Sequence, residues 1–265
     1  MILVEKLPLA LAIDAGNTRT KWALFDEAGK LCSQGVCLNS DLPSTEFFKI
    51  GTACDRVVIS NVASAEIGAL LQTKCLNLGL IVHWAVPSGE ACHVKNNYDY
   101  PSQLGSDRWA ALIAAWHIVH APCVVVNVGT AATIDALTFN DDGVMFLDGL
   151  FLGGVILPGL RLMQQALVQG ADRIAITSGN LGSFPTNTSD AVHTGVCLAI
   201  VGAITQVSHQ LEVHCATKPN IILSGGDAAL LMPLLLNQLN CDFSEQVILC
   251  ENLVLQGLYL LDNDQ

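Results

Sequence analysis

The chain has 265 residues, of which 51% are hydrophobic, and its formal net charge is −12 at pH 7. This length favours two lobes or one large α/β unit with a sizeable apolar core. The negative charge argues against nucleic acid or an anionic membrane as a partner, because both bind basic surfaces. The ten cysteines are scattered singly, without a C-x-x-C pair, which favours reduced thiols in the cytoplasm.

The N-terminal residues "MILVEKLPLA" lack the basic region and the cleavage motif of a signal peptide. The apolar run "LFLGGVILPGL", which starts at Leu150, is too short and too interrupted by glycine to cross a bilayer. We therefore expect a cytoplasmic protein that does not bind membranes.

Strand and helix patterns alternate along the chain. Short apolar runs bounded by polar residues or glycine predict strands at Leu9–Ile13, Thr20–Phe25, Arg56–Ser60, Val124–Val128, Thr133–Thr138 and Ile221–Leu223. Apolar residues at helical spacing predict helices at Gly105–His120, Pro158–Val168, Asp190–Glu212 and Asp227–Leu236. This order indicates an α/β fold. A lobe boundary is expected near His120–Cys123, which gives lobes of residues 1–120 and 121–265.

An internal repeat relates the two lobes. When the chain is shifted by 113 positions, "LAIDAGNTRTKWAL" aligns with "VVVNVGTAATIDAL", so that Asp14 lies over Asn127 and Gly16 over Gly129. Both segments have the pattern of a strand, a tight turn and a strand. The repeat predicts a duplication in which each lobe begins with a β-hairpin.

The two repeated hairpins have the composition of phosphate-binding turns. We call Asp14–Lys21 the first turn segment and Asn127–Asp135 the second turn segment. Glycine and small hydroxyl residues let backbone N–H groups approach a phosphate closely. Asp14 would then bind Mg²⁺ indirectly, and Arg19 and Lys21 would neutralise phosphate charge. The alternative is that these residues only satisfy turn geometry, but their occurrence in register in both lobes favours a nucleotide site.

A second candidate site is "LGSDRWAAL", where Asp107 and Arg108 begin an apolar helix. The alternative role is helix capping, with Ser106 as N-cap and Asp107 in the first turn. A kinase that acts on an alcohol needs a carboxylate to accept the hydroxyl proton, and a cation to bind an acidic substrate. Asp135 could line the phosphate site or serve as a turn acceptor. Packing rather than catalysis is expected for the histidines beside apolar segments: His83, His117 and His120.

In combination, these segments resemble the type III pantothenate kinases of the actin, sugar kinase and Hsp70 superfamily. The matching motifs follow in order from residue 11 to about residue 260: "DAGNTRTK", "YDYPSQLGSDRW", "NVGTAATID", "GGVILPGLRLMQQAL", "NTSDAVHTG" and "LSGGD". The resemblance implies two duplicated ribonuclease H-like or actin-like lobes, each with a mixed sheet flanked by helices. It also implies ATP-dependent phosphorylation of pantothenate to 4′-phosphopantothenate, the first step of coenzyme A biosynthesis.

The resemblance also implies roles for individual residues. Asp107 would be the general base, and Arg108 would bind the pantothenate carboxylate. The ATP site would comprise Asp14, Ala15, Gly16, Asn17, Thr18, Arg19, Thr20, Lys21 and Thr130, with Asp14 serving Mg²⁺. The other substrate-binding residues would be Tyr98, Gly105, Ser106 and Thr188. Thr188 would act at a homodimer interface, where a neighbouring subunit helps to wall the pocket.

The chain departs from the family pattern at Asn127, where an aspartate commonly helps to hold an activating K⁺ or NH₄⁺. Because the Asn127 side chain is neutral, the requirement for a monovalent cation stays open. The first eight residues extend beyond the usual start of the family. Two alternatives remain: a kinase for another small hydroxy acid or sugar, and a regulatory or accessory protein with lost catalysis. The retained Asp14, Lys21, Asp107 and Arg108 argue against the second.

Overall fold

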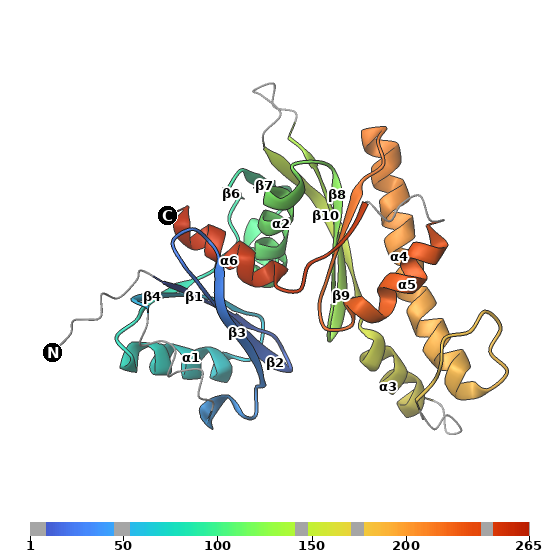
Figure 1. The fold of residues 1–265 in the computed structure, drawn as a ribbon, viewed down its shortest axis with the longest axis horizontal. Coiled ribbons are helices and arrows are strands. Elements are labelled where there is room, and N and C mark those ends of the chain that lie inside the picture. The colour runs from blue at the N-terminus through green and yellow to red at the C-terminus, as the bar shows by residue number, and fades with distance from the viewer. Residues whose placement is uncertain (1–8, 45–53, 141–147, 171–177, 240–245, 265) are drawn as a thin grey trace. The chain divides into compact units, whose positions relative to one another are not determined.

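The computed structural model describes residues 9–44, 54–140, 148–170, 178–239 and 246–264 (Figure 1). Contacts divide the chain into two compact units, Met1–Ile118 together with Asn252–Gln265, and Val119–Glu251. The junction near Val119 lies close to the expected boundary between residues 120 and 121. The C-terminal segment, expected in the second lobe, belongs to the first unit. The expected leader, residues 1–8, lies outside the described residues.

The first unit contains a five-stranded mixed sheet in the order β3-β2-β1-β4-β5. Its strands are β1 (Ala10–Ala15), β2 (Arg19–Phe25), β3 (Leu31–Leu38), β4 (Arg56–Asn61) and β5 (Ile81–Trp84). Strands β1, β2 and β3 pair antiparallel, whereas β4 pairs parallel with β1 and β5 parallel with β4. The polar end of β1 therefore lies between the start of β2 and the end of β4.

Helices cover both faces of this sheet, α1 (Ala65–Asn77) on one face and α6 (Leu253–Asn263) on the other (Figure 1). The large side chains of Leu11 and Ile13 in β1 pack in one core cluster with Leu71 of α1. The residue between them is Ala12, and the small side chains of Ala10 and Ala12 leave room for α6 on the opposite face. This alternation of large and small side chains explains why β1 is buried on both faces.

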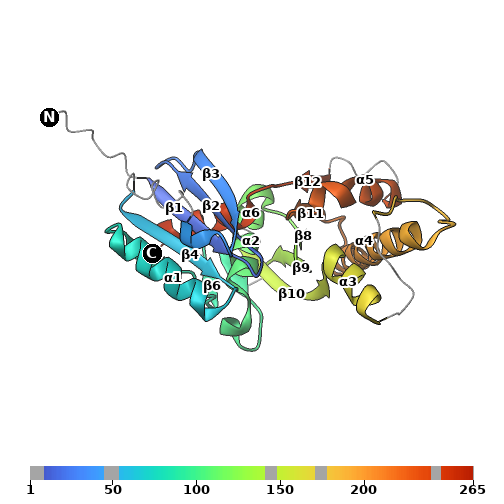
Figure 2. The same ribbon diagram turned by 90° about the horizontal axis from the view of Figure 1, so that it is seen from below.

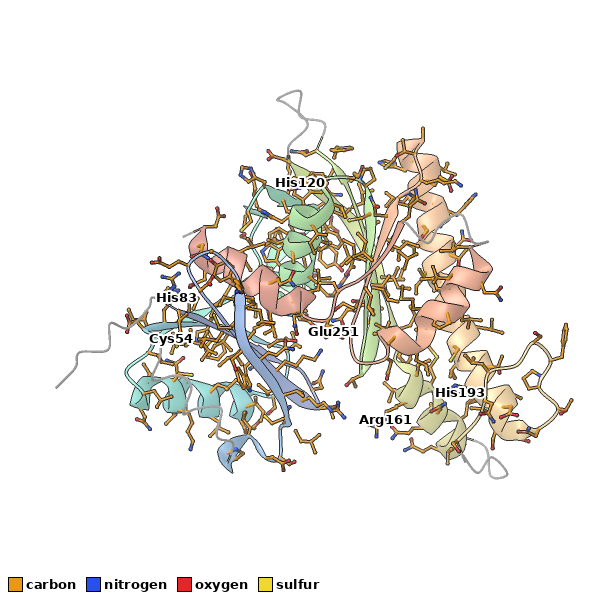
Figure 3. The ribbon with its side chains drawn as sticks, in the orientation of Figure 1. Cys54, His83, His120, Arg161, His193 and Glu251 are labelled. Atoms are coloured by element: carbon orange, nitrogen blue, oxygen red, sulfur yellow. The ribbon has the colours of Figure 1, made fainter. Side chains whose placement is uncertain are left out.

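The C-terminal helix α6 is fixed to the first unit by specific contacts. The buried carboxylate of Asp262 accepts hydrogen bonds from Arg56 Nε and, at 2.8 Å, pairs with His83 Nδ1. The ring of Tyr259 lies 5.0 Å from that of Phe25. His83, which is labelled in Figure 3, therefore has a structural partner. These contacts explain why the C-terminal segment lies with the first unit.

The rest of the first unit consists of short elements and one buried helix. The short elements are η1 (Leu42–Ser44), the hairpin β6 (Glu90–Ala91) and β7 (Val94–Asn96), and η3 (Pro101–Gln103). In helix α2 (Ser106–Val119), every residue from Ser106 to Trp116 except Asp107 is buried. Trp109 and Trp116 are both 0% exposed, as expected for core residues.

In the second unit five strands lie in the order β12-β11-β8-β9-β10. They are β8 (Cys123–Val128), β9 (Ala131–Phe139), β10 (Gly149–Pro158), β11 (Asn220–Ser224) and β12 (Val247–Leu249). The helices are α3 (Leu160–Gly170), α4 (Thr188–Cys215) and α5 (Ala228–Gln238). Helices α4 and α5 lie on one face of the sheet (Figures 1 and 2), where their apolar residues share a core with β8, β9 and β11.

Among the described helices, α4 is long and apolar enough to cross a membrane by length and composition. A core helix of a soluble protein meets the same criterion. Ile200 and Ile204 of α4 are fully buried in the core that the helix forms with the sheet. The apolar run that starts at Leu150 lies in β10.

The duplication predicted from the internal repeat is present in the fold. Each sheet begins with three antiparallel strands in sequence order, followed by two parallel strands on the other side of the first strand. In the two leading hairpins Asp14 pairs with Lys21, and Asn127 pairs with Thr133. The turn between β8 and β9 is thus one residue shorter than the turn between β1 and β2. The shift of 113 positions therefore aligns β1 with β8, but it misaligns β2 and β9 by one residue.

Candidate active site

The first turn segment connects β1 to β2 and presents an exposed backbone. The N–H of Gly16 donates to the carbonyl oxygen of Arg19 at 3.1 Å, which closes the turn. Asn17, Thr18 and Arg19 are exposed. Small residues at an exposed, closed turn allow a phosphate to approach the backbone.

Asn39, which follows β3, forms hydrogen bonds with three residues of this turn segment. The sequence did not predict this supporting role. Its Oδ1 accepts a hydrogen bond from the hydroxyl of Thr20 at 2.9 Å, and its Nδ2 donates to the carbonyl oxygen of Gly16 at 2.8 Å. Its backbone N–H donates to the carbonyl oxygen of Thr18 at 3.1 Å. The buried Thr20 side chain is therefore directed at Asn39 and supports the turn from inside the fold.

Asp14 lies at the end of β1, with Lys21 as its register partner in β2 and Ser60 as its partner in β4. Its Oδ1 is buried and has no hydrogen-bond partner among the described residues. Burial, reinforced by the negative charge of Asp107, raises the pKa of Asp14 to about 7, although Lys21 and a hydrogen bond from Ser60 oppose this shift. A buried carboxylate oxygen without a partner is a suitable ligand for a hard cation.

The start of α2 brings Ser106 and Asp107 to the same region of the first unit. The buried Ser106 hydroxyl lies 2.9 Å from the hydroxyl of Ser60. Ser106 is the first helical residue, and this contact is not the N-cap bond that the capping alternative would require. Asp107 Oδ1 accepts the backbone N–H of Arg108 at 2.8 Å, while burial raises the pKa of Asp107.

Arg108 is only 6% exposed and is held by Tyr98. Its Nη1 donates to the Tyr98 hydroxyl oxygen at 2.9 Å, and its guanidinium carbon lies 5.6 Å from the centre of the Tyr98 ring. Gly105 lies against the neighbouring carboxylate, since a Cβ atom there would be 2.5 Å from Asp107 Oδ1. The first unit thus brings together Tyr98, Gly105, Ser106, Asp107, Arg108 and the first turn segment.

This arrangement contains the groups needed for phosphoryl transfer to an alcohol. The raised pKa of Asp107 suits a proton acceptor, and Arg108 offers a fork of donors to a carboxylate. No group of three or more His, Cys, Asp or Glu side chains that could hold a metal occurs among the described residues. Mg²⁺ would nevertheless fit at Asp14, because this ion commonly uses one or two carboxylates together with substrate phosphates and water.

In the second unit, two glycines, Gly159 and Gly225, pack closely against the second turn segment. The N–H of Gly129 donates to the carbonyl oxygen of Ala131 at 2.9 Å, and Thr130 is exposed. A Cβ atom on Gly159 would lie 2.0 Å from the carbonyl oxygen of Gly129. Gly225 has a φ of +102° and a similarly close contact with Val128, so both positions exclude a side chain.

Asp135 lies inside β9 rather than in the turn. It is 1% exposed, and its register partner in β10 is Gly154. A Cβ atom on Gly154 would lie 1.9 Å from Asp135 Oδ1, so the carboxylate occupies the space above that glycine. Asp135 therefore does not belong to the turn itself.

Thr188 is the first residue of α4, and Asn187 caps the helix by accepting the N–H of Asp190 at 2.9 Å. Thr188 lines a cavity of about 930 Å³ together with apolar residues of α3 and α4. The two helices are also joined by a 3.2 Å contact between Gln164 and His193, the latter labelled in Figure 3. Thr130 and Thr188 both belong to the second unit.

Comparison with known proteins identifies related sequences over nearly the whole chain. A family model described as type III pantothenate kinase matches residues 10–210. A type III pantothenate kinase from Methylobacillus flagellatus is 44% identical over 253 residues, which cover 95% of this chain and 97% of that protein.

Similar solved structures share the fold of this chain. A proposed Baf family transcriptional activator from Campylobacter jejuni aligns with a TM-score of 0.56 at 21% identity, covering 96% of this chain and 97% of that one. A proposed N-acetylmannosamine kinase from Listeria monocytogenes aligns with a TM-score of 0.51 at 12% identity, covering 96% and 99%. At these identities the likeness shows the fold alone, and it confirms the expected actin-like, sugar kinase-like architecture.

Proposed function

The chain belongs to the type III pantothenate kinase family, and from this we infer that its reaction is the ATP-dependent phosphorylation of pantothenate in coenzyme A biosynthesis. The observation that carries this conclusion is the 44% identity to a type III pantothenate kinase over nearly the full length of both chains. Neither a kinase for another substrate nor a regulatory protein with lost catalysis is favoured.

We propose that Asp107 is the catalytic base. The terminal hydroxyl oxygen of pantothenate forms a bond to the γ-phosphorus of ATP, the bond from that phosphorus to the bridging oxygen breaks, and ADP leaves. The hydroxyl proton passes to the carboxylate of Asp107. This role is supported by the raised pKa of Asp107 and by Gly105, which leaves room for the carboxylate.

Arg108 binds the carboxylate of pantothenate in this proposal. Its bond to Tyr98 and its burial fix the guanidinium before the substrate arrives, which reduces the entropy lost on binding. Ser106 and Thr188 contribute hydroxyl groups to the substrate site.

The first turn segment binds the phosphates of ATP through Ala15, Gly16 and the exposed Asn17, Thr18 and Arg19, with Lys21 nearby. Thr130 of the second turn segment contributes a further donor. Asp14 would hold Mg²⁺, whose charge would neutralise phosphate oxygens. The buried, unpartnered Oδ1 of Asp14 supports this role.

The protein acts as a cytoplasmic homodimer in this proposal. Although α3 is strongly amphipathic, Leu160 is its only buried residue among those described, and Leu162, Leu167 and Val168 are exposed. Leu167 also lines the cavity that Thr188 lines, so a second copy of the chain would cover apolar surface there. Light scattering on the purified protein tests this, since a single-chain mass would contradict it. The net charge of −12 supports the absence of nucleic acid and anionic membranes as partners.

The deciding experiment is a coupled ADP-release assay with Mg·ATP and pantothenate, run on the wild type and on Asp107→Asn. We expect pantothenate-dependent turnover that is lost in the variant, while the variant still binds ATP. Turnover that the variant retains would remove Asp107 from its role as base. Absence of turnover in the wild type would contradict the reaction itself.

A further inference from the structure

A buried serine that is absent from the predicted site lies between two of its polar groups. Ser60 is in β4, 0% exposed, and its Cα is the register partner of Asp14 in the parallel pairing of β1 with β4. Its hydroxyl oxygen lies 2.9 Å from the hydroxyl oxygen of Ser106 at the start of α2. Paired residues of adjacent strands direct their side chains to the same face of the sheet, so the Ser60 side chain lies beside that of Asp14.

The contact between the two serines joins two elements of the first unit. Ser60 belongs to β4, and Ser106 is the first residue of α2, one position before Asp107. Either hydroxyl can donate to the other, and the contact gives each of the two buried groups a hydrogen-bond partner.

The surroundings of Ser60 indicate that this contact is more than incidental packing. The three residues that precede it in β4, Val57–Ile59, are buried and apolar. A hydroxyl in such a place costs free energy unless it is hydrogen-bonded. Its partner is the residue next to the proposed base, and its neighbour in β1 is the residue proposed to hold Mg²⁺.

We propose that Ser60 is a positioning residue for phosphoryl transfer, which fixes the start of α2, and with it Asp107, against the end of β1 that carries Asp14. This inference rests on the proposed function of Asp14 and Asp107. Ser60 occupies one side of the Asp14 carboxylate and leaves the buried Oδ1 directed to a ligand.

The test compares Ser60→Ala, which lacks the hydroxyl, with Ser60→Thr, which retains it. Ser208→Ala is a matched control, because Ser208 is also buried but its hydroxyl has no partner among the described residues. We expect Ser60→Ala to lower kcat by about tenfold to a hundredfold, the rate equivalent of leaving the buried Ser106 hydroxyl without its partner. Ser60→Thr should recover most of this loss, and Ser208→Ala should leave turnover unchanged.

A second readout does not depend on activity. In the protein without ligands, amide hydrogen exchange reports how firmly the start of α2 is held. We expect the amides of Asp107 and Arg108 to exchange faster in Ser60→Ala than in the wild type, and Ser60→Thr to restore the slower exchange.

The outcomes separate this inference from the proposed function. Unchanged exchange at the start of α2 in Ser60→Ala overturns the inference, and so does a loss of kcat that Ser60→Thr does not recover. If Ser60→Ala does not fold, Ser60→Cys provides the same comparison with a weak donor of similar size. If the wild type shows no pantothenate-dependent turnover, the proposed function fails, whereas hydrogen exchange still reports whether Ser60 fixes the start of α2.

Discussion

The side-chain amide of Asn39 donates to the carbonyl oxygen of Gly16 at 2.8 Å, so a residue beyond the end of β3 fixes the turn between β1 and β2. The same side chain accepts the hydroxyl of Thr20. Asn39 therefore restrains both sides of the turn proposed to bind phosphate, without itself belonging to that turn.

We expect Asn39→Ala to raise the Kd for Mg·ATP by about tenfold, which corresponds to the loss of roughly one net hydrogen bond. The turn would lose two side-chain contacts and sample conformations in which its N–H groups do not converge. Isothermal titration calorimetry measures the effect, with Asn77→Ala at the exposed end of α1 as the control. An unchanged Kd in Asn39→Ala would show that the turn needs no support from β3.

Gly105 offers a test of the position of Asp107. A Cβ atom at Gly105 would approach Asp107 Oδ1 to 2.5 Å, so the carboxylate must move in Gly105→Ala. We expect kcat to fall by about a hundredfold, because a displacement of roughly 1 Å at a reacting group has effects of that size. Steady-state kinetics measure this change.

The control for Gly105 is Gly89→Ala, since a Cβ atom at Gly89 meets nothing within 4 Å. It should keep the activity of the wild type. Full activity of Gly105→Ala would mean that the carboxylate of Asp107 is free to rotate without loss of function.

The residues of the candidate site differ in how well the sequence predicts them. Asp107 and the first turn segment stand out because polar residues interrupt apolar runs there. Asn39 and Ser60 give no such signal, since an asparagine or a serine at a strand end is common. Their contacts depend on register, in which β3 pairs with β2 and β4 pairs with β1. Those pairings join residues that are distant in the sequence.

The same limit applies to the fold. The hairpins β1–β2 and β8–β9 were predicted because their strands are buried and apolar. Strand β3 was missed, because it lies at an edge and many of its residues are exposed. The assignment of α6 to the second lobe followed chain order, whereas Asp262 pairs with Arg56 and His83, which are distant in the sequence. No local pattern predicts such long-range contacts.

The monovalent-cation requirement can be tested at Asn127, which holds the place in β8 that Asp14 holds in β1. A neutral amide offers an ion an oxygen but no charge. We expect turnover to be the same in K⁺ and in Na⁺ at equal ionic strength. Asn127→Asp should introduce a preference for K⁺ and raise its apparent affinity by about tenfold, since an added charge near an ion contributes on the order of 1–4 kcal/mol. A strong dependence of the wild type on K⁺ would contradict this expectation.

The last prediction concerns the stability of the protein without ligands. Burial raises the pKa of Asp14 to about 7 in the folded chain, above its ordinary value of 3.8. Between these two values the folded state binds more protons than the unfolded state, so the contribution of Asp14 to stability falls as pH rises from about 4 to about 7. Above pH 7 the ionised carboxylate is buried and disfavours folding. Asp14→Asn removes this cost and should stabilise the protein at pH 8, by an amount on the order of 2–4 kcal/mol.

Urea unfolding of the two proteins at several pH values measures this difference. It should be largest at pH 8, shrink as pH falls below 7, and approach its minimum below pH 3.8, where Asp14 is protonated in both states. The exposed Asp99, changed to asparagine, is the control for the loss of a carboxylate without burial. If Asp14→Asn were less stable than the wild type at pH 8, the carboxylate would have to be stabilised by its surroundings in the absence of a cation. Its unpartnered Oδ1 would then no longer support a site for Mg²⁺ at the end of β1.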